Sequence, residues 1–419
     1  MSDMSVDAGA QRTSPLISFW LSPRQTIERV VAERPRYLVL PLITVGGAAS
    51  AASLFTGYGV GSDIISWRIL LACVVGAAIF AVFNLYMVAA VTGWLGRKFG
   101  GTASNEAVRA VIAWGALPNI LGLAIVLSIA AIVRISGMET NSRLLPSLFD
   151  IVHGVCGLWG MIVTVLMLSR VERFGFWRAV AAYGVGALVL SAGLAVAIRT
   201  FLFQPFSLPA SSMAPTLLSG DYIFAAKYPY GYTRFSLPLS PPLFSGRIFG
   251  SVPARGDVVV FRLPKDTSTD YVKRVVGLPG DRIQMKNGEL FINDVAMRRE
   301  RIEDFAESDP CGGGPPNVKR WRETLPEGAS YETLDCVNRG FYDDTNVYTV
   351  PPGHLFMLGD NRDNSTDSRF LGQVGYVPQE NLIGRAQMIF FSIGEGEHAW
   401  MFWRWPWAVR WNRFFKIVR

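Results

Sequence analysis

The chain has 419 residues, of which 50% are hydrophobic and only 17% are charged, a balance that is unusual for a soluble protein of this length. With its positive mean hydropathy, this composition indicates a membrane protein. The net charge of +7 does not indicate nucleic-acid binding, because cations that flank membrane spans give the same total and no nucleic-acid-reading module is evident.

Five apolar runs in the first half of the chain are long enough to cross a bilayer, which takes about 20 helical residues. None of them contains Asp, Glu, Lys or Arg, and small residues recur within them, so the helices are expected to pack as one bundle. Pro118 and Asn119 inside the third run predict a kink. The runs are approximately Tyr37–Thr56, Ile69–Leu95, Ala110–Val133, Ile151–Ser169 and Ala179–Ile198.

The Lys and Arg residues that flank these runs predict an orientation. One side would hold eleven of them, from Arg12 to Arg178, whereas the other short loops hold three, Arg68, Arg134 and Arg143. The positive-inside rule therefore places the N-terminus in the cytoplasm, and an odd number of spans places the chain after Ile198 on the outer side. The first 20 residues lack a cationic start followed by an apolar core, so no cleavable signal peptide is expected.

The chain changes character after the fifth run, where short β-type segments alternate with Gly and Pro turn signals. This pattern predicts a mainly-β domain on the outer side of the membrane, with an insertion around residues 299–345. The expected strands are Val258–Phe261, Tyr271–Val276, Arg282–Met285, Glu289–Ile292, His354–Leu358 and Gly384–Phe391.

One of these segments, YVKRVVGLPGD from Tyr271 to Asp281, places Lys273 in an otherwise apolar strand. Two interpretations are open. The cations could mark an edge strand that resists aggregation, or Lys273 could be desolvated until it becomes a neutral base. A base is relevant because Ser211 and Ser212, a few residues beyond the fifth run, are weak nucleophiles without one.

Other chemistries have little support in the composition. The chain has three histidines and no CxxC pair, so neither a metal site nor a cofactor is expected. Cys311 and Cys336 both lie in the insertion, on the side where oxidation occurs; they are either a disulfide or two free thiols.

Four segments together resemble the signature boxes of type I signal peptidases, the membrane-bound serine-lysine endopeptidases of family S26. They are Ser212–Leu217, Arg255–Phe261, Asp270–Asp281 and Gly359–Arg369. The resemblance implies that Ser212 attacks the scissile carbonyl while neutral Lys273 takes its proton, and that Ser365 orients the lysine amine. It also implies a bacterial inner-membrane enzyme with a periplasmic catalytic domain. The supporting ion pairs would come from Asp360, Asp367, Arg369 and Arg274.

The sequence departs from the commonest family pattern at one position. Many members have a serine two residues before the nucleophile that helps to bind the oxyanion, and this chain has Ala210. The Ser212 N–H remains available, and Ser211 could add a hydroxyl only if its side chain turns inward.

The resemblance also implies the substrate. An extended peptide would pair beside the dyad and place small residues before the cut, as in the A-x-A end of secretory signal peptides. The partners would be secretory preproteins, membrane lipid, which the Trp-rich segment Trp400–Arg419 would contact, and the secretion machinery. The expected pocket residues are Phe206, Leu208, Ala210, Met213, Leu217, Tyr271 and Val272.

The N-terminal part resembles Yip1-family membrane domains in its amphipathic start and glycine-rich spans. Three regions are expected: 1–175 as a Yip1-like domain with four spans, 176–203 as the fifth span and anchor, and 204–419 as the catalytic domain. A membrane scaffold with an inactive peptidase-like domain is the alternative, because of Ala210.

Overall fold

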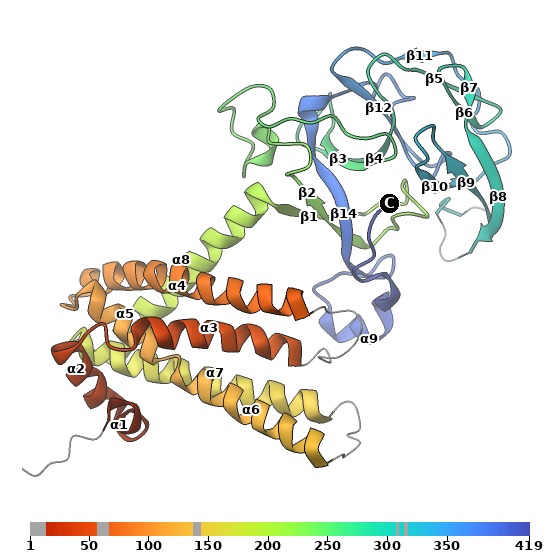
Figure 1. Cartoon of the computed structure of the whole chain (residues 1–419). Coiled ribbons are helices and arrows are strands. Elements are labelled where there is room, and N and C mark those ends of the chain that lie inside the picture. The colour runs from red at the N-terminus through yellow and green to blue at the C-terminus, as the bar shows by residue number, and fades with distance from the viewer. Residues whose placement is uncertain (1–13, 57–66, 137–143, 307–309, 314–316) are drawn as a thin grey trace, which may run out of the picture. The chain divides into compact units, whose positions relative to one another are not determined.

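The computed structural model describes residues 14–56, 67–136, 144–306, 310–313 and 317–419. The chain forms two compact units, Met1–Gly193 and Leu194–Arg419. The boundary falls within one long helix, α8 (Phe176–Phe201), so a single helix contributes to both units (Figure 1).

The first unit is helical, and its core gathers around α5 (Asn105–Trp114). The Ser104 hydroxyl accepts a hydrogen bond from the Ala107 N–H and caps this helix. At its other end the fully buried Trp114 indole donates to the Tyr37 carbonyl at 3.2 Å. The other helices are α1 (Pro15–Leu21), α2 (Pro23–Glu33), α3 (Val39–Thr56), α4 (Trp67–Lys98), α6 (Leu117–Ser136), α7 (Leu144–Val171) and α8.

Four helical stretches among the described residues are long and apolar enough to cross a membrane: Cys73–Lys98, Asn105–Val133, Leu148–Val171 and Phe176–Phe201. The apolar stretch of α3, Val39–Ala48, is shorter. The kink expected in the third run takes the form of a break, since α5 ends at Trp114 and α6 begins at Leu117 with Pro118 in its first turn. Proline is tolerated there because the N–H it lacks would have no partner in that turn.

The second unit is built on a seven-stranded antiparallel sheet in the order β1-β2-β14-β3-β4-β12-β13. Both faces of this sheet are covered. Val258 and Val260 of β3 pack into one core and Val259 and Phe261 into another, which explains the unbroken apolar run in this strand. The strands are β1 (Phe203–Ser207), β2 (Asp221–Ala226), β3 (Val258–Arg262), β4 (Asp270–Gly277), β12 (His354–Leu358), β13 (Val377–Pro378) and β14 (Leu382–Ser392).

Strand β4, which carries Lys273, lies in the interior of this sheet. It pairs with β3 on one side and with β12 on the other. The pairing with β12 runs only from Arg274 to Gly277, so the strand is covered on both sides at Arg274, whereas Asp270 to Lys273 pair with β3 alone among the described strands. The interpretation of the cations as marks of an edge strand therefore fails for Arg274, and the strand keeps a free backbone edge beside Lys273.

Two smaller sheets complete the second unit (Figure 1). The four-stranded sheet has the order β11-β5-β6-β7, and the three-stranded sheet β10-β9-β8 occupies much of the expected insertion. A short helix, α9 (Trp405–Ala408), lies near the end of the chain. The strands are β5 (Arg282–Lys286), β6 (Glu289–Ile292), β7 (Val295–Ala296), β8 (Arg298–Phe305), β9 (Val318–Thr324), β10 (Ser330–Asp335) and β11 (Tyr348–Thr349).

Candidate active site

Ser212 lies in the loop that joins β1 to β2. The loop is closed at its base by backbone hydrogen bonds between Leu208 and Asp221 (2.9 Å) and between Gly220 and Leu208 (2.8 Å). Met213 is buried beside the serine and anchors the loop in the apolar core. Ser212 itself stays half-buried at the surface of the unit, so a fixed backbone presents an accessible hydroxyl.

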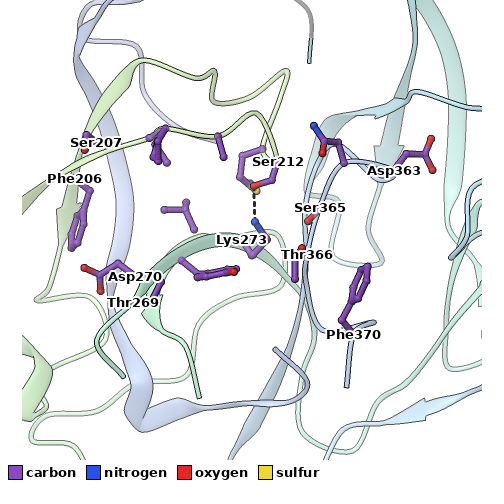
Figure 2. Close-up of a pocket in the computed structure, with 17 residues that line it drawn as sticks. Phe206, Ser207, Ser212, Thr269, Asp270, Lys273, Asp363, Ser365, Thr366 and Phe370 are labelled. Carbon is purple, nitrogen blue, oxygen red and sulfur yellow. Dashed lines mark hydrogen bonds between the residues drawn. The ribbon is translucent and has the colours of Figure 1, made fainter. Parts of the chain in front are cut away.

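Lys273 reaches this serine from the middle of β4. Its Nζ lies 2.6 Å from Ser212 Oγ, within hydrogen-bonding distance, as Figure 2 shows. The lysine is only 3% exposed, and the ring of Tyr271 lies 5.4 Å from its amine. The two residues of the expected dyad, 61 positions apart in sequence, are therefore brought together.

The environment of Lys273 disfavours its charge. Burial in the sheet lowers the pKa of Lys273 from 10.5 to about 8. The carboxylates of Asp367 and Asp360 act in the opposite direction and keep the pKa from falling further, while the Arg369 guanidinium adds to the decrease. The amine can therefore exist in its neutral form near physiological pH.

Arg274, the next residue of β4, points to the other face of the sheet and has a different partner. It forms a bidentate ion pair with Asp360, with Nε–Oδ1 and Nη2–Oδ2 distances of 2.7 and 2.6 Å. Both side chains are 1% exposed, and Thr216 Oγ donates to the same carboxylate at 2.6 Å. This buried pair joins the segment after Ser212 to the strand of Lys273.

A second buried ion pair lies within the segment Gly359–Arg369. Asp367 accepts two hydrogen bonds of 2.8 Å from the Arg369 guanidinium and one of 3.0 Å from the Gly359 N–H. Burial alone would raise the pKa of Asp367, but the attraction of Arg369 and these donors outweigh it and hold the pKa below its usual value. Asp367 is therefore a fixed negative charge near Lys273.

Ser365 lies beside the dyad in the same cavity (Figure 2). Its hydroxyl is buried and has no hydrogen-bond partner of good geometry among the described residues, although it is near enough to Asp367 to help lower the pKa of that carboxylate. The expected hydrogen bond from Ser365 to the lysine amine is thus not formed in this structure. Gly359 permits the close packing here, since a Cβ at this position would overlap Ser365 and lie 2.6 Å from the Ser212 carbonyl oxygen.

The dyad opens onto a cavity of about 510 Å³. Leu217 is the one expected pocket residue that does not line it; this side chain is 1% exposed and packs into the apolar core behind the loop. The cavity is also lined by residues that were not expected, Thr269, Asn364, Thr366 and Phe370 among them. The expected residues that line it are Phe206, Leu208, Ala210, Met213, Tyr271 and Val272.

The Ser211 side chain does not turn toward the dyad. Its Oγ donates to the Pro310 carbonyl at 3.0 Å and accepts from Asn364 Nδ2 at 3.2 Å, so the hydroxyl is engaged on the side of the insertion. The suggestion that Ser211 replaces the missing hydroxyl at Ala210 is therefore not supported by this geometry. The Ser212 N–H has no hydrogen-bond acceptor among the described residues.

The insertion contributes buried groups that motif analysis missed. Glu323 of β9 pairs with Arg362 at 2.6 Å, and the ring of Tyr331 of β10 lies 4.1 Å from the Arg274 guanidinium. No local pattern in β9 or β10 marks these residues, which reach the site only through tertiary packing. Cys311 and Cys336 form a disulfide, and no cluster of potential metal ligands occurs in the part of the chain that the structure describes.

Comparison with known proteins agrees with this geometry. The family model for signal peptidase, peptidase S26, matches residues 181–391, and the model for the Yip1 domain matches residues 17–198. The chain is 42% identical over 207 residues to a signal peptidase I of Rickettsia typhi, covering 48% of this chain and 76% of that protein. It is 40% identical over 240 residues to a signal peptidase I of Rickettsia akari, covering 53% of this chain and 88% of that protein.

A crystal structure of a signal peptidase I from Enterococcus faecalis V583 is 25% identical and covers 32% of this chain and 97% of that chain, with a TM-score of 0.19. The S26 match covers half of the chain, and both Rickettsia proteins are matched over more than two thirds of their length. The chain therefore belongs to the signal peptidase family, peptidase S26, and is a serine peptidase that removes signal peptides.

Proposed function

We propose that the chain cleaves secretory preproteins by a serine-lysine mechanism in which Ser212 is the nucleophile and Lys273 the general base. The 2.6 Å contact between Lys273 Nζ and Ser212 Oγ carries this proposal. It joins a weak nucleophile to a basic group that is within reach of its proton, and it is the one hydrogen bond recorded for this hydroxyl among the described residues.

The lowered pKa makes Lys273 usable as a base. With a pKa of about 8, roughly one lysine in ten is neutral at pH 7, compared with about one in three thousand at a pKa of 10.5. Ser212 Oγ attacks the scissile carbonyl carbon as its proton passes to Lys273 Nζ. The peptide bond breaks, the new amine of the mature protein takes this proton, and the signal peptide remains esterified to Ser212 until water hydrolyses the ester.

Ser365 is the residue best placed to orient the lysine. Its buried hydroxyl lacks a partner of good geometry in the described part of the chain, and a small rotation of the lysine or the serine when substrate binds would satisfy it. Asp360, Asp367, Arg369 and Arg274 act as fixed ion pairs that position Lys273 and Ser365, since their own charges are satisfied.

Oxyanion stabilisation falls to the Ser212 N–H. This donor has no acceptor among the described residues, position 210 is an alanine, and the Ser211 hydroxyl is bonded to Pro310 and Asn364, so neither position supplies a second donor. A single backbone donor gives weaker stabilisation than a pair, so the chain should be a slower enzyme than relatives with a serine at this position.

The cavity supports cleavage after small residues. Apolar side chains from Phe206, Leu208, Met213 and Tyr271 narrow it beside the dyad, and the exposed strand β1 offers backbone for pairing with an extended peptide. Small residues one and three positions before the cut, as in A-x-A, would fit these apolar subsites.

We also place the protein in the bacterial inner membrane, with its N-terminus in the cytoplasm, five spans and a periplasmic catalytic unit. The cation asymmetry of the loops supports this orientation. Contact with lipid is supported by Trp400, Trp403, Trp407 and Trp411, each more than half exposed, next to several arginines. The secretion machinery, which delivers the substrate, is the expected protein partner.

The decisive experiment compares cleavage of a secretory preprotein in lipid by the wild type and by the Ser212→Ala and Lys273→Ala variants. We expect the wild type to cut after an A-x-A site, as located by mass spectrometry, and both variants to be inactive while folded. A wild type that cuts nothing a known signal peptidase cuts in the same lipid would favour the scaffold with an inactive peptidase-like domain.

A further inference from the structure

A backbone carbonyl of the insertion contacts the loop between β1 and β2 that carries Ser212, called the nucleophile loop below. The oxygen of Pro310 accepts hydrogen bonds from three side chains: Ser211 Oγ at 3.0 Å, Asn361 Nδ2 at 2.8 Å and Asn364 Nδ2 at 2.8 Å. Ser211 precedes the nucleophile, and Asn364 precedes Ser365 and lines the cavity. A shift of this carbonyl would therefore affect the positions of both Ser212 and Ser365.

The Pro310 carbonyl is itself held by the disulfide. Pro310 is followed by Cys311, which is bonded to Cys336. On the other side of the bond, Cys336 Sγ lies 3.4 Å from Asn361 Oδ1, and the Val337 N–H donates to Asp363 Oδ2 at 2.9 Å. Both ends of the disulfide are thus attached to the segment that carries Ser365.

A chain of backbone hydrogen bonds links the same elements. The Asn361 N–H donates to the Ser212 carbonyl at 3.2 Å, and Leu334 of β10 exchanges hydrogen bonds with Asp360 and Arg362. Behind them, Ala214 of the nucleophile loop packs in one apolar cluster with Leu334, and both cysteines pack against this cluster. The disulfide therefore lies in the layer that supports the dyad.

We propose that the disulfide between Cys311 and Cys336 positions the nucleophile, acting through the adjoining Pro310 carbonyl on Ser211, and that full activity needs this disulfide. The proposal rests on the assignment of Ser212 as the nucleophile. Opening the bond takes two electrons and two protons from a dithiol reductant, which is oxidised to its own disulfide, and leaves two thiols. The carbonyl then loses its covalent tie to Cys336 and is held by its hydrogen bonds alone, so it can shift relative to Ser211, and a displacement of about 1 Å at a nucleophile can lower a rate about a hundredfold.

The test uses the full chain in lipid with Cys73→Ser and Cys156→Ser as the background, so that Cys311 and Cys336 are the only cysteines among the four of the chain. Preprotein cleavage is measured with and without a dithiol reductant, well below the melting temperature of each form. Ser212→Ala in the oxidised background tests the assigned nucleophile by itself. The Cys311→Ser/Cys336→Ser double variant shows any effect of the reductant that does not pass through the disulfide.

We expect reduction to lower kcat about tenfold and to change KM by less than about twofold, because Phe206, Leu208 and Tyr271 pack with other apolar clusters than the one that the two cysteines contact. The double variant should match the reduced form and not respond to reductant. Equal kcat in the oxidised and reduced forms would overturn the proposal even if Ser212→Ala is inactive. Unfolding of the reduced form at the assay temperature would also overturn it, because the disulfide would then stabilise the whole fold and not position the nucleophile.

Ser211 distinguishes positioning from simple stabilisation. Ser211→Ala removes one hydrogen bond to the Pro310 carbonyl and should lower kcat about fivefold, the effect expected of one such bond. If the disulfide acts through this contact, reduction should lower the kcat of the Ser211→Ala variant by a clearly smaller factor than it lowers the kcat of the wild type. Ser211→Thr, which keeps the hydroxyl, should retain the wild-type response. Fully additive effects of Ser211→Ala and reduction would overturn the proposed route.

Discussion

At the scale of single residues, the charge state of Lys273 controls the proposed reaction. Only the neutral amine can accept the Ser212 proton, and the pKa of Lys273 is lowered to about 8. We therefore expect kcat/KM to rise with pH up to about 8 and to level off above it, since deprotonation creates the active form. The measurement is a pH profile of kcat/KM on a preprotein whose own groups do not titrate in this range.

Asp367→Asn provides the control for this profile. The Asp367 carboxylate is the largest influence that raises the pKa of Lys273, so removing its charge should shift the rising limb to lower pH. The variant should also lose about 3 kcal/mol or more of stability, because the buried Arg369 is left without its partner. If the rising part of the kcat/KM profile stays at the same pH in a folded Asp367→Asn variant, Lys273 is not the titrating group.

Burial of Lys273 should also reduce the stability of the fold. The unfolded chain binds the lysine proton up to a pKa near 10.5 and the folded chain only up to about 8, so stability should rise with pH between these values. Below pH 8 the lysine is charged in both states, so the whole cost of burying the charge lowers the free energy of unfolding. The difference between the two pKa values corresponds to about 3 kcal/mol. We expect Lys273→Met to be inactive and to unfold at a higher temperature than the wild type at pH 7.

Calorimetry of both proteins at pH 7 and at pH 10 checks this expectation. The difference in melting temperature should shrink at the higher pH, where the wild-type lysine is neutral in the folded protein. A Lys273→Met variant that melts at a lower temperature than the wild type at pH 7 would show that packing around the amine outweighs its desolvation.

At the scale of elements, the segment Gly359–Arg369 must approach the nucleophile loop very closely. A Cβ on residue 359 would overlap the Ser365 side chain and approach the Ser212 carbonyl oxygen. We expect Gly359→Ala to force these two elements apart and to lower kcat at least a hundredfold. Gly372→Ala is the matched control, since nothing lies within 4 Å of its added methyl group, and its activity should stay within twofold of the wild type.

The elements also show what the sequence can predict. The strand containing Lys273 and five other apolar strands stand out because alternation and turn residues mark them locally, and the structure places strands at all six. Strands β8, β9 and β10 are rich in charged residues and half-exposed, so their pattern is typical of a loop. Glu323 and Tyr331 were missed with them, because only the packing of this sheet brings these residues to Arg362 and Arg274.

The same reasoning applies to the site. Ser212, Lys273 and the ion pairs lie in dense motifs and were predicted, whereas the bonding of Ser211 to the insertion and the burial of Leu217 depend on side-chain directions that no motif specifies. The contacts of the Pro310 carbonyl could not be predicted either, because every residue has a backbone carbonyl and the residue type does not indicate what it binds.

At the scale of the whole molecule, helix α8 belongs to both parts of the chain. The Yip1 match ends at residue 198 and the S26 match begins at residue 181, so the two families overlap within this helix. One helix thus ends the membrane bundle and begins the peptidase. The side of the membrane on which the peptidase works therefore depends on whether the number of helices that cross the membrane, up to and including α8, is odd or even.

The parity of the spans makes α3 the helix that decides this side. If α3 crosses the membrane together with the four longer candidates, Lys98 returns to the side of the N-terminus and the catalytic unit lies on the opposite side. If α3 does not cross, both placements are reversed. The cations Arg97, Lys98 and Arg109 favour a cytoplasmic loop after α4, and hence a spanning α3.

We therefore expect reporter proteins fused after Lys98 and after Phe203 to report opposite sides, the first cytoplasmic and the second periplasmic. A fluorescent protein that folds only in the cytoplasm and a phosphatase that is active only in the periplasm give complementary signals at each position. The reverse pattern at both positions would show that α3 does not span. It would also place the dyad in the cytoplasm, away from the translocated ends of signal peptides, and the proposed action on secretory preproteins would then fail on topology alone.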